Sequence, residues 1–144
     1  MGLELPPRRS AGLYMGAAAS GALVFVSGAI PVGPDGLVAG KVGAGIDVTG
    51  AQAAARLCVL GGLSALREEI GDLDRVRRVV KLTGFVNSAP GFTEQHVVMD
   101  GASRLLVELF GEKGSHARSS VGVAELPLNA AVEVEMTVEV DVGG

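Results

Sequence analysis

The C-terminal part of the chain alternates apolar and polar residues with a period of two, and this pattern constrains the fold more than any other feature. The apolar positions are Val121, Val123, Val132, Val134, Met136, Val138 and Val140. The polar positions of the last segment are Glu133, Glu135, Thr137, Glu139 and Asp141. Such alternation predicts half-buried β-strands with two distinct faces. The simplest interpretation is an antiparallel pair of strands whose polar face meets water.

Strand and helix signals follow one another through the rest of the chain. Strands are expected over residues 14–19, 23–26, 29–32 and 76–86. Helices are expected over residues 48–70 and from 92 or 93 to 110. The strand 76–86 is basic, and its charges face either water or the acidic last strand. This order of elements predicts an α+β domain.

Local signals mark where several of these elements begin, bend and end. Gly28 predicts a bulge in the strand around it, and Pro34-Asp35-Gly36 predicts a turn. Either Asp47 or a capping box that starts at Thr49 begins the first helix. Gly71 is expected to end that helix.

The length of 144 residues predicts a single domain, and 48% hydrophobic residues are enough for a core. We expect an irregular lead-in over residues 1–10 and one domain over residues 11–144. Cys58 is the single cysteine and lies in an alanine-rich helical segment, which predicts a buried thiol. No apolar run has the length of a signal peptide or a membrane span, so we expect a cytoplasmic protein.

Several function classes are disfavoured by the sequence. A net charge of −4 argues against non-specific nucleic-acid binding. The glycine-rich segment 38–46 does not complete the dinucleotide motif G-x-G-x-x-G, because Val48 stands where its third glycine is needed. It does not complete a P-loop either, because Gly40-Lys41 lacks the upstream glycine and the following Ser or Thr. No cluster of cysteines or carboxylates at ligand spacing accompanies His96 and His116, so we expect surface or loop histidines and neither a metal nor a cofactor.

Arg118 and Glu133 are the residues whose chemistry suggests a function. A guanidinium offers a fixed fork of donors, which suits a carboxylate ligand better than an ammonium does. A carboxylate such as Glu133 can hold or deprotonate a water molecule. Together the two groups suit the addition of water to a small acidic substrate.

A series of short motifs, taken in order and spacing, resembles the reactive-intermediate deaminase family (RidA, also called YjgF-like). The motifs are Tyr14, Ser27-Gly28, Val79-Val80-Lys81, Ala117-Arg118-Ser119, Leu126-Pro127 and Val132-Glu133-Val134-Glu135. Older names of this family are L-PSP endoribonuclease and translation initiation inhibitor. The resemblance implies a chorismate-mutase-like fold, in which two helices pack on one face of a mixed sheet. It also implies a homotrimer with a ligand site in each cleft between subunits.

The resemblance also implies roles for individual residues. Arg118 is expected to bind a substrate carboxylate, and Glu133 is expected to activate the attacking water. Tyr14 is expected to line the site across the subunit boundary, and Ser27 with Gly28 is expected to shape the pocket floor.

Two positions depart from the best-known members of the family. Ser120, whose backbone is expected near the substrate or water, stands where they have cysteine. Asp100 stands where they have asparagine, and its charge opposes an acidic substrate. The segments around Ser103 and His116 resemble a divergent branch.

Three functions remain open at the level of sequence. The first is hydrolysis of amino-acid-derived enamines and imines to 2-oxo acids and ammonia, as the resemblance implies. The second is a non-catalytic trimer that binds small carboxylates through the same arginine. The third is the ribonuclease or translation-inhibitor role of the older family names, which the acidic net charge and the absence of a histidine pair disfavour.

Overall fold

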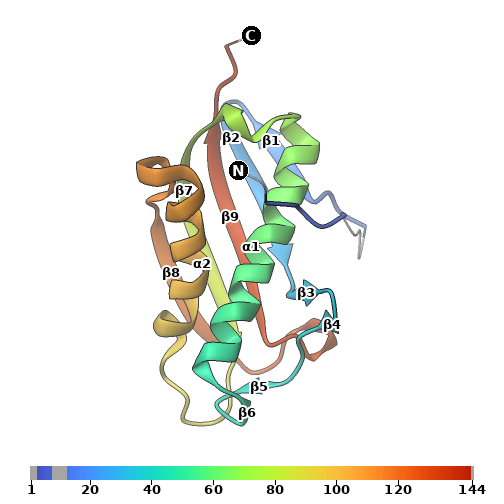
Figure 1. Cartoon of the computed structure of the whole chain (residues 1–144), viewed down its shortest axis with the longest axis vertical. Coiled ribbons are helices and arrows are strands. Elements are labelled where there is room, and N and C mark those ends of the chain that lie inside the picture. Colours follow the sequence, from blue (N-terminus) through green and yellow to red (C-terminus); the bar gives the residue numbers. More distant parts are fainter. Residues whose placement is uncertain (1–2, 8–12, 144) are drawn as a thin grey trace.

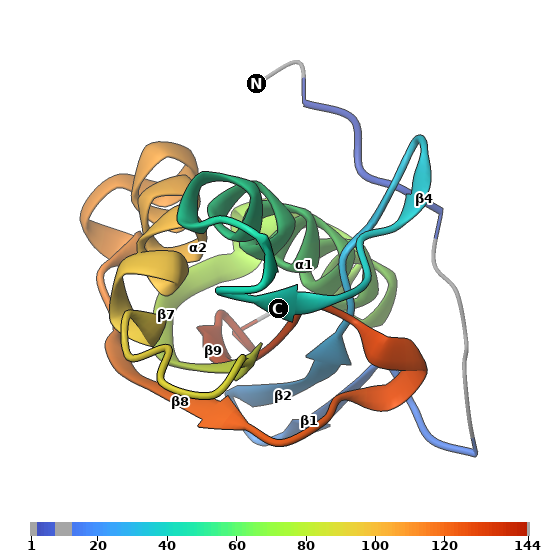
Figure 2. The ribbon, with the colours of Figure 1, turned by 90° about the horizontal axis from the view of Figure 1, so that it is seen from below.

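The chain folds as a mixed β-sheet that carries two α-helices on one of its faces (Figures 1 and 2). The computed structural model describes residues 3–7 and 13–143. The helices are α1 (Val48–Ile70) and α2 (Gln95–Phe110). The strands of the sheet are β1 (Ala17–Ser20), β2 (Leu23–Ala29), β7 (Val76–Asn87), β8 (Ala117–Val123) and β9 (Val132–Val140). Their order across the sheet is β1-β2-β9-β7-β8, with β7 and β8 parallel and the other pairs antiparallel.

Short elements connect the main ones. They are β3 (Val32–Gly33), β4 (Gly36–Leu37), β5 (Lys41–Val42), β6 (Gly45–Ile46), and the 3₁₀ turns η1 (Leu73–Arg75), η2 (Gly111–Gly114) and η3 (Pro127–Asn129). The turn predicted at residues 34–36 joins β3 to β4, and Gly36 adopts the positive φ of 100° that the turn requires. The bulge predicted near Gly28 is confirmed by a shift of register between Val26 and Ala29.

The bounds of α1 agree with the prediction from the sequence. Of the two predicted start signals, Asp47 is the N-cap, because its side chain accepts a hydrogen bond of 2.8 Å from the Gly50 backbone N–H. Gly71 ends the helix at φ 89°, and its N–H donates to the Arg67 carbonyl at 2.7 Å. The other helix, α2, starts later than predicted, because Phe92 forms a turn with Ala89 instead.

The core lies between the helices and the sheet, and small residues on α1 allow a close approach. The buried residues of this stripe include Ala51, Ala54, Ala55, Cys58 and Gly62. Cys58 is 0% exposed, as predicted. The apolar positions of β9 are buried along its whole length, which confirms the alternation predicted for that strand.

The two strands with the alternating pattern do not form the expected antiparallel pair. β7 lies between them and pairs with both, in parallel with β8 and antiparallel with β9. The reason is that α2 links β7 to β8 as a crossover, and such a connection returns the chain to the end of the sheet where β7 began. The same pairing places Arg78 opposite Glu139, so the basic strand lies beside the acidic one.

The predicted burial of the valines on β8 is also wrong, since Val121 is 43% exposed. β8 is an edge strand, and its even-numbered residues face α2. A Cβ on Gly122 would lie 2.7 Å from the side chain of Gln95 in α2, which confirms this orientation. The valines therefore face the side of the sheet that carries no helix within the described residues.

Residues 3–7 of the expected lead-in form neither helix nor strand and lie against α1. The Ser64 hydroxyl donates to the Pro6 carbonyl at 2.6 Å, and Leu5 packs on the core. The other residues of the lead-in, 1–2 and 8–10, lie outside the described residues.

Candidate functional site

Arg118 and Glu133 face opposite sides of the sheet. Arg118 stands level with Leu82 on β7, and Leu82 stands level with Met136 on β9. Since Leu82 and Met136 are buried beneath the helices, Arg118 points to the helix face. Glu133 stands level with Phe85, three residues further along β7, and therefore points to the other face.

On the helix face, Arg118 is held by three acceptors of α2. Nη1 donates to Asp100 Oδ1 at 3.0 Å and to Ser103 Oγ at 3.0 Å, and Nη2 donates to the His96 carbonyl at 3.1 Å. The Arg118 and Asp100 side chains are 22% and 50% exposed, so this ion pair lies at the surface of the site. We call His96, Asp100, Ser103, His116 and Arg118 the arginine cluster.

His116 joins this cluster through Ser103. Its Nε2 lies 2.9 Å from Ser103 Oγ, and its Nδ1 lies 2.6 Å from the Gly114 carbonyl. A carbonyl only accepts hydrogen bonds, so Nδ1 donates to Gly114, and in the tautomer that carries its proton on Nδ1 the Nε2 atom accepts from the Ser103 hydroxyl. His116 is half-buried, and it holds the serine that in turn holds Arg118.

Ser120 lies two residues beyond Arg118 on the same face of β8. Its hydroxyl is buried and has no hydrogen-bond partner within the described part of the chain. It stands level with Gly84 of β7, where a Cβ would come within 2.2 Å of the Met99 sulfur. The Ser120 hydroxyl is thus enclosed between β8 and α2, in the row between Arg118 and Gly122.

On the opposite face, the Glu133 carboxylate lies against the backbone of Gly28. A Cβ on Gly28 would stand 2.5 Å from Glu133 Oε2, so only glycine leaves room for the carboxylate there. Partial burial raises the pKa of the Glu133 carboxyl from its ordinary 4.5, and the negative charge of Glu135 is the second and smaller cause of the rise. A carboxylate with a raised pKa is a stronger base, which suits proton transfer from water.

Ser27 positions the segment that carries Tyr14. The Ser27 hydroxyl donates to the Met15 carbonyl at 2.6 Å, and the Ser27 N–H donates to the Gly16 carbonyl at 2.9 Å. Tyr14 itself is 57% exposed. We call Gly28 and Glu133, together with Ser27 next to Gly28 in the chain, the glutamate cluster.

The arginine cluster and the glutamate cluster do not meet within one chain. They lie on opposite faces of the sheet, and β7 separates the strand of Arg118 from that of Glu133. Tyr14 lies next to β1, at the edge of the sheet opposite to β8. Both clusters can act on one ligand only if a second chain brings one of them to the other.

Sequence reasoning missed the roles of Ser103 and His116. A signal for Ser103 was present, because His96, Asp100 and Ser103 are spaced by four and three residues and so share one face of a helix. No comparable signal marked His116, since its contact with Ser103 depends on the path of the chain between α2 and β8.

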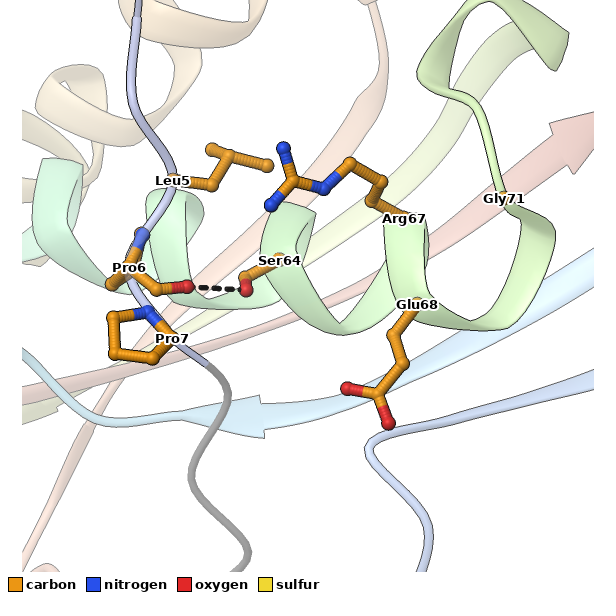
Figure 3. Close-up of a pocket in the computed structure, with 7 residues that line it drawn as sticks. All are labelled: Leu5, Pro6, Pro7, Ser64, Arg67, Glu68 and Gly71. Carbon is orange, nitrogen blue, oxygen red and sulfur yellow. Dashed lines mark hydrogen bonds between the residues drawn. The ribbon is translucent and has the colours of Figure 1, made fainter.

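A pocket of about 560 Å³ lies elsewhere, between residues 5–7 and α1 (Figure 3). Its lining includes Ser64, Arg67 and Glu68, and it contains none of the site residues predicted from the sequence.

Within the described residues, no group of three or more His, Cys, Asp and Glu side chains is placed to hold a metal ion. None of the helices there has the length and apolar character needed to cross a membrane.

Several known proteins are similar to this chain over most of their own length. Protein TCP17 of Trypanosoma cruzi is 49% identical over 144 residues, which cover 98% of this chain and 90% of that protein. The crystal structure of Atu1372 from Agrobacterium tumefaciens matches with a TM-score of 0.90 and 46% identity, over 98% of this chain and 88% of that one. A "putative endoribonuclease" from Shewanella oneidensis matches with a TM-score of 0.92 and 34% identity, over 96% and 93% of the two chains.

The family comparison agrees with the motifs and with the fold. Residues 1–140 match the family described as "YjgF/chorismate mutase-like, putative endoribonuclease". The mixed sheet with two helices on one face is also the architecture of the matching structures. The chain therefore belongs to the YjgF/chorismate-mutase-like family, as the order and spacing of its motifs predicted.

Proposed function

We propose that the protein hydrolyses amino-acid-derived enamines and imines to 2-oxo acids and ammonia, in sites formed between the chains of a homotrimer. The observation that carries this proposal is Glu133, a half-buried carboxylate of raised pKa placed against Gly28. A general base works best when its pKa approaches the working pH, and burial moves the Glu133 carboxyl in that direction.

An assembly of several chains is supported by the two faces of the sheet. Arg118 and Glu133 need a second chain to act on the same ligand, because they point to opposite faces. The helix-free face also exposes large apolar side chains, among them Leu23, Phe25 and Val121. An exposed apolar face of this kind favours contact with another protein surface. The number of three chains in the proposed assembly is inferred from the family resemblance.

In the proposed reaction, Arg118 binds the substrate carboxylate and Glu133 accepts a proton from water. The water oxygen then bonds to the imine carbon while the C=N electron pair moves to nitrogen. A proton from the added oxygen moves to nitrogen, the C–N bond breaks, and ammonia leaves with a 2-oxo acid as the other product. Glu133 gives the proton that it took from water to the nitrogen, so the nitrogen gains two protons in all, one through Glu133 and one from the added oxygen.

The test of this proposal is Glu133→Gln, which keeps the shape of the side chain and removes its basicity. We expect turnover of an imine generated from an amino acid to fall by about 10²–10⁴-fold, the usual contribution of a general base. Affinity for a 2-oxo acid is expected to hold or rise, because a nearby negative charge is removed. Glu139→Gln is the matched control, since it makes the same change on the same face of β9.

Turnover of the Glu133→Gln variant within a few-fold of wild type would remove Glu133 from the reaction. A folded wild type that binds 2-oxo acids, yet hydrolyses none of several imines, would instead be a carboxylate-binding protein of the same architecture. The pH profile gives a further check, because the acid limb of activity is expected above pH 4.5, the ordinary pKa of the group.

A further inference from the structure

The guanidinium of Arg118 already has an acidic partner within its own chain, and from this we infer that the site selects zwitterionic ligands. Such a ligand has a cationic nitrogen next to its carboxylate, as in an α-amino acid or the iminium form of a 2-imino acid. The inference rests on the proposed function, in which Arg118 binds the carboxylate, and it specifies the charge of the ligand.

Arg118 retains two donors for a ligand after its contacts within the chain are counted. Both Nη1 hydrogens are used, one by Asp100 Oδ1 and one by Ser103 Oγ, each at 3.0 Å. One Nη2 hydrogen is used by the His96 carbonyl at 3.1 Å. Within residues 3–7 and 13–143, the Nε hydrogen and the second Nη2 hydrogen have no acceptor. A ligand carboxylate is therefore expected to accept from these two groups.

Asp100 presents one oxygen to the same space. Its Oδ1 accepts from Arg118, whereas its Oδ2 has no partner in the described part of the chain, and the side chain is 50% exposed. Arg104 lies one turn further along α2, and no ion pair between Arg104 and Asp100 is present in the described part of the chain. Oδ2 is thus placed to accept a hydrogen bond from a cationic N–H, and it repels a second anionic group.

Ser103 and His116 hold this pair of charges in place. Ser103 Oγ accepts from Arg118 Nη1 and donates to His116 Nε2, while His116 Nδ1 donates to the Gly114 carbonyl. Arg118 is therefore fixed by contacts on two sides rather than by Asp100 alone. Because the guanidinium is held there, the Asp100 carboxylate stays beside any ligand that the guanidinium binds.

This arrangement also suits the proposed reaction. The iminium form of a 2-imino acid carries one positive and one negative charge, and it is the form whose carbon water attacks. Water and the zwitterion together give a 2-oxo acid anion and an ammonium ion, so charge and atoms balance. Asp100 favours the protonated nitrogen before the attack, and it disfavours the anionic 2-oxo acid afterwards, which helps the product to leave.

The experiment compares L-alanine with pyruvate, which share a carbon skeleton and differ in the nitrogen. Isothermal calorimetry on the wild-type protein is expected to give tighter binding of L-alanine. In Asp100→Asn the ratio of the two affinities is expected to shift toward pyruvate by about 10–100-fold, the effect of one charge-assisted hydrogen bond. Glu108→Gln is the matched control, because it removes one negative charge from α2 at the Arg56 ion pair and is expected to leave the ratio unchanged.

Asp100→Ser, which also removes the charge, replaces the asparagine variant if thermal unfolding shows that Asp100→Asn is not folded. Asp100→Glu keeps the charge and is expected to keep the preference for L-alanine. The inference is overturned if wild type binds pyruvate at least as tightly, if it binds neither ligand, or if the ratio is unchanged when the charge is removed. Loss of the proposed function is seen separately, as absent imine hydrolysis with the preference for L-alanine intact.

Discussion

Arg118 and Glu133 point to opposite faces of one sheet and are separated by β7, so a single chain cannot bring them to one ligand. The arginine cluster is complete within the chain, with its ion pair and its serine–histidine support. The glutamate cluster lies on the helix-free face, where apolar side chains are exposed. This division makes the oligomeric state the first property to measure.

We expect sedimentation equilibrium at micromolar concentration to give a mass three times that of the 14.5 kDa chain. Phe25→Asp is expected to dissociate the assembly, because it places a charge on the helix-free face, where Phe25 is 49% exposed. Val107→Asp is the control, since Val107 is 45% exposed but lies on α2. A monomeric wild type would contradict the trimer, and a Phe25 variant that still assembles would contradict the helix-free face as its interface.

Arg118→Lys keeps the positive charge but loses the fork of donors. We expect binding of small 2-oxo acids to weaken by about 1.5–3 kcal/mol, the size of a hydrogen bond to a charged group. Calorimetry measures this directly, and Arg104→Lys on the exposed surface of α2 is the control. Unchanged affinity in the Arg118 variant would mean that the carboxylate of the 2-oxo acid does not bind at Arg118.

The raised pKa of Glu133 has a consequence for stability. The folded state binds this proton more readily than the unfolded chain does, so the carboxyl favours folding below pH 4.5 and disfavours it as pH rises through the folded pKa. Glu133→Gln is therefore expected to be more stable than wild type at pH 7, and the difference is expected to vanish below pH 4.5. Urea unfolding between pH 4 and pH 8 checks this, and an equal difference at all pH values would refute it.

Gly28→Ala tests whether the position of the Glu133 carboxylate matters. The added Cβ would stand 2.5 Å from Oε2, and the flexible carboxylate is expected to move away. Because a displacement of about 1 Å can cost about 10²-fold in rate, we expect activity to fall on that scale with little loss of stability. Thermal unfolding alongside the imine assay separates the two effects; full activity would mean that the carboxylate position is not critical.

Gly101→Ala is expected to destabilise the fold, since its Cβ would stand 2.4 Å from the Gln52 carbonyl oxygen on α1. The two helices would have to separate, at a cost of about 1–3 kcal/mol, as for other overpacked cores. Gly61→Ala on α1 is the matched control, because its Cβ would meet Ala29 at an ordinary 3.6 Å. The control is expected to stabilise by about 0.5–1 kcal/mol through helix propensity, and denaturant titration of both variants measures the contrast. A Gly101 variant as stable as the control would show that the helices adjust without cost.

The elements whose signals are local could be predicted from the order of the amino acids. Asp47 and Gly71 satisfy the free backbone groups at the two ends of α1, so the bounds of that helix could be predicted. The valines of β9 were predicted to be buried because one face of that strand is apolar and the other is acidic. The motifs around Arg118 and Glu133 predicted the family for the same reason, since their order and spacing lie in the chain itself.

The identity of neighbouring strands and of the buried face of β8 depends instead on how the folded chain packs. Alternation defines two faces of a strand. On β8 one face carries Arg118, Ser120 and Gly122, and the other carries valines. Hydrophobicity alone therefore predicted that the valine face is buried, which is wrong. α2 covers the polar face because its Asp100 and Ser103 supply partners for Arg118. Strand order and such side-chain pairs depend on contacts between residues far apart in the chain, which no local pattern encodes.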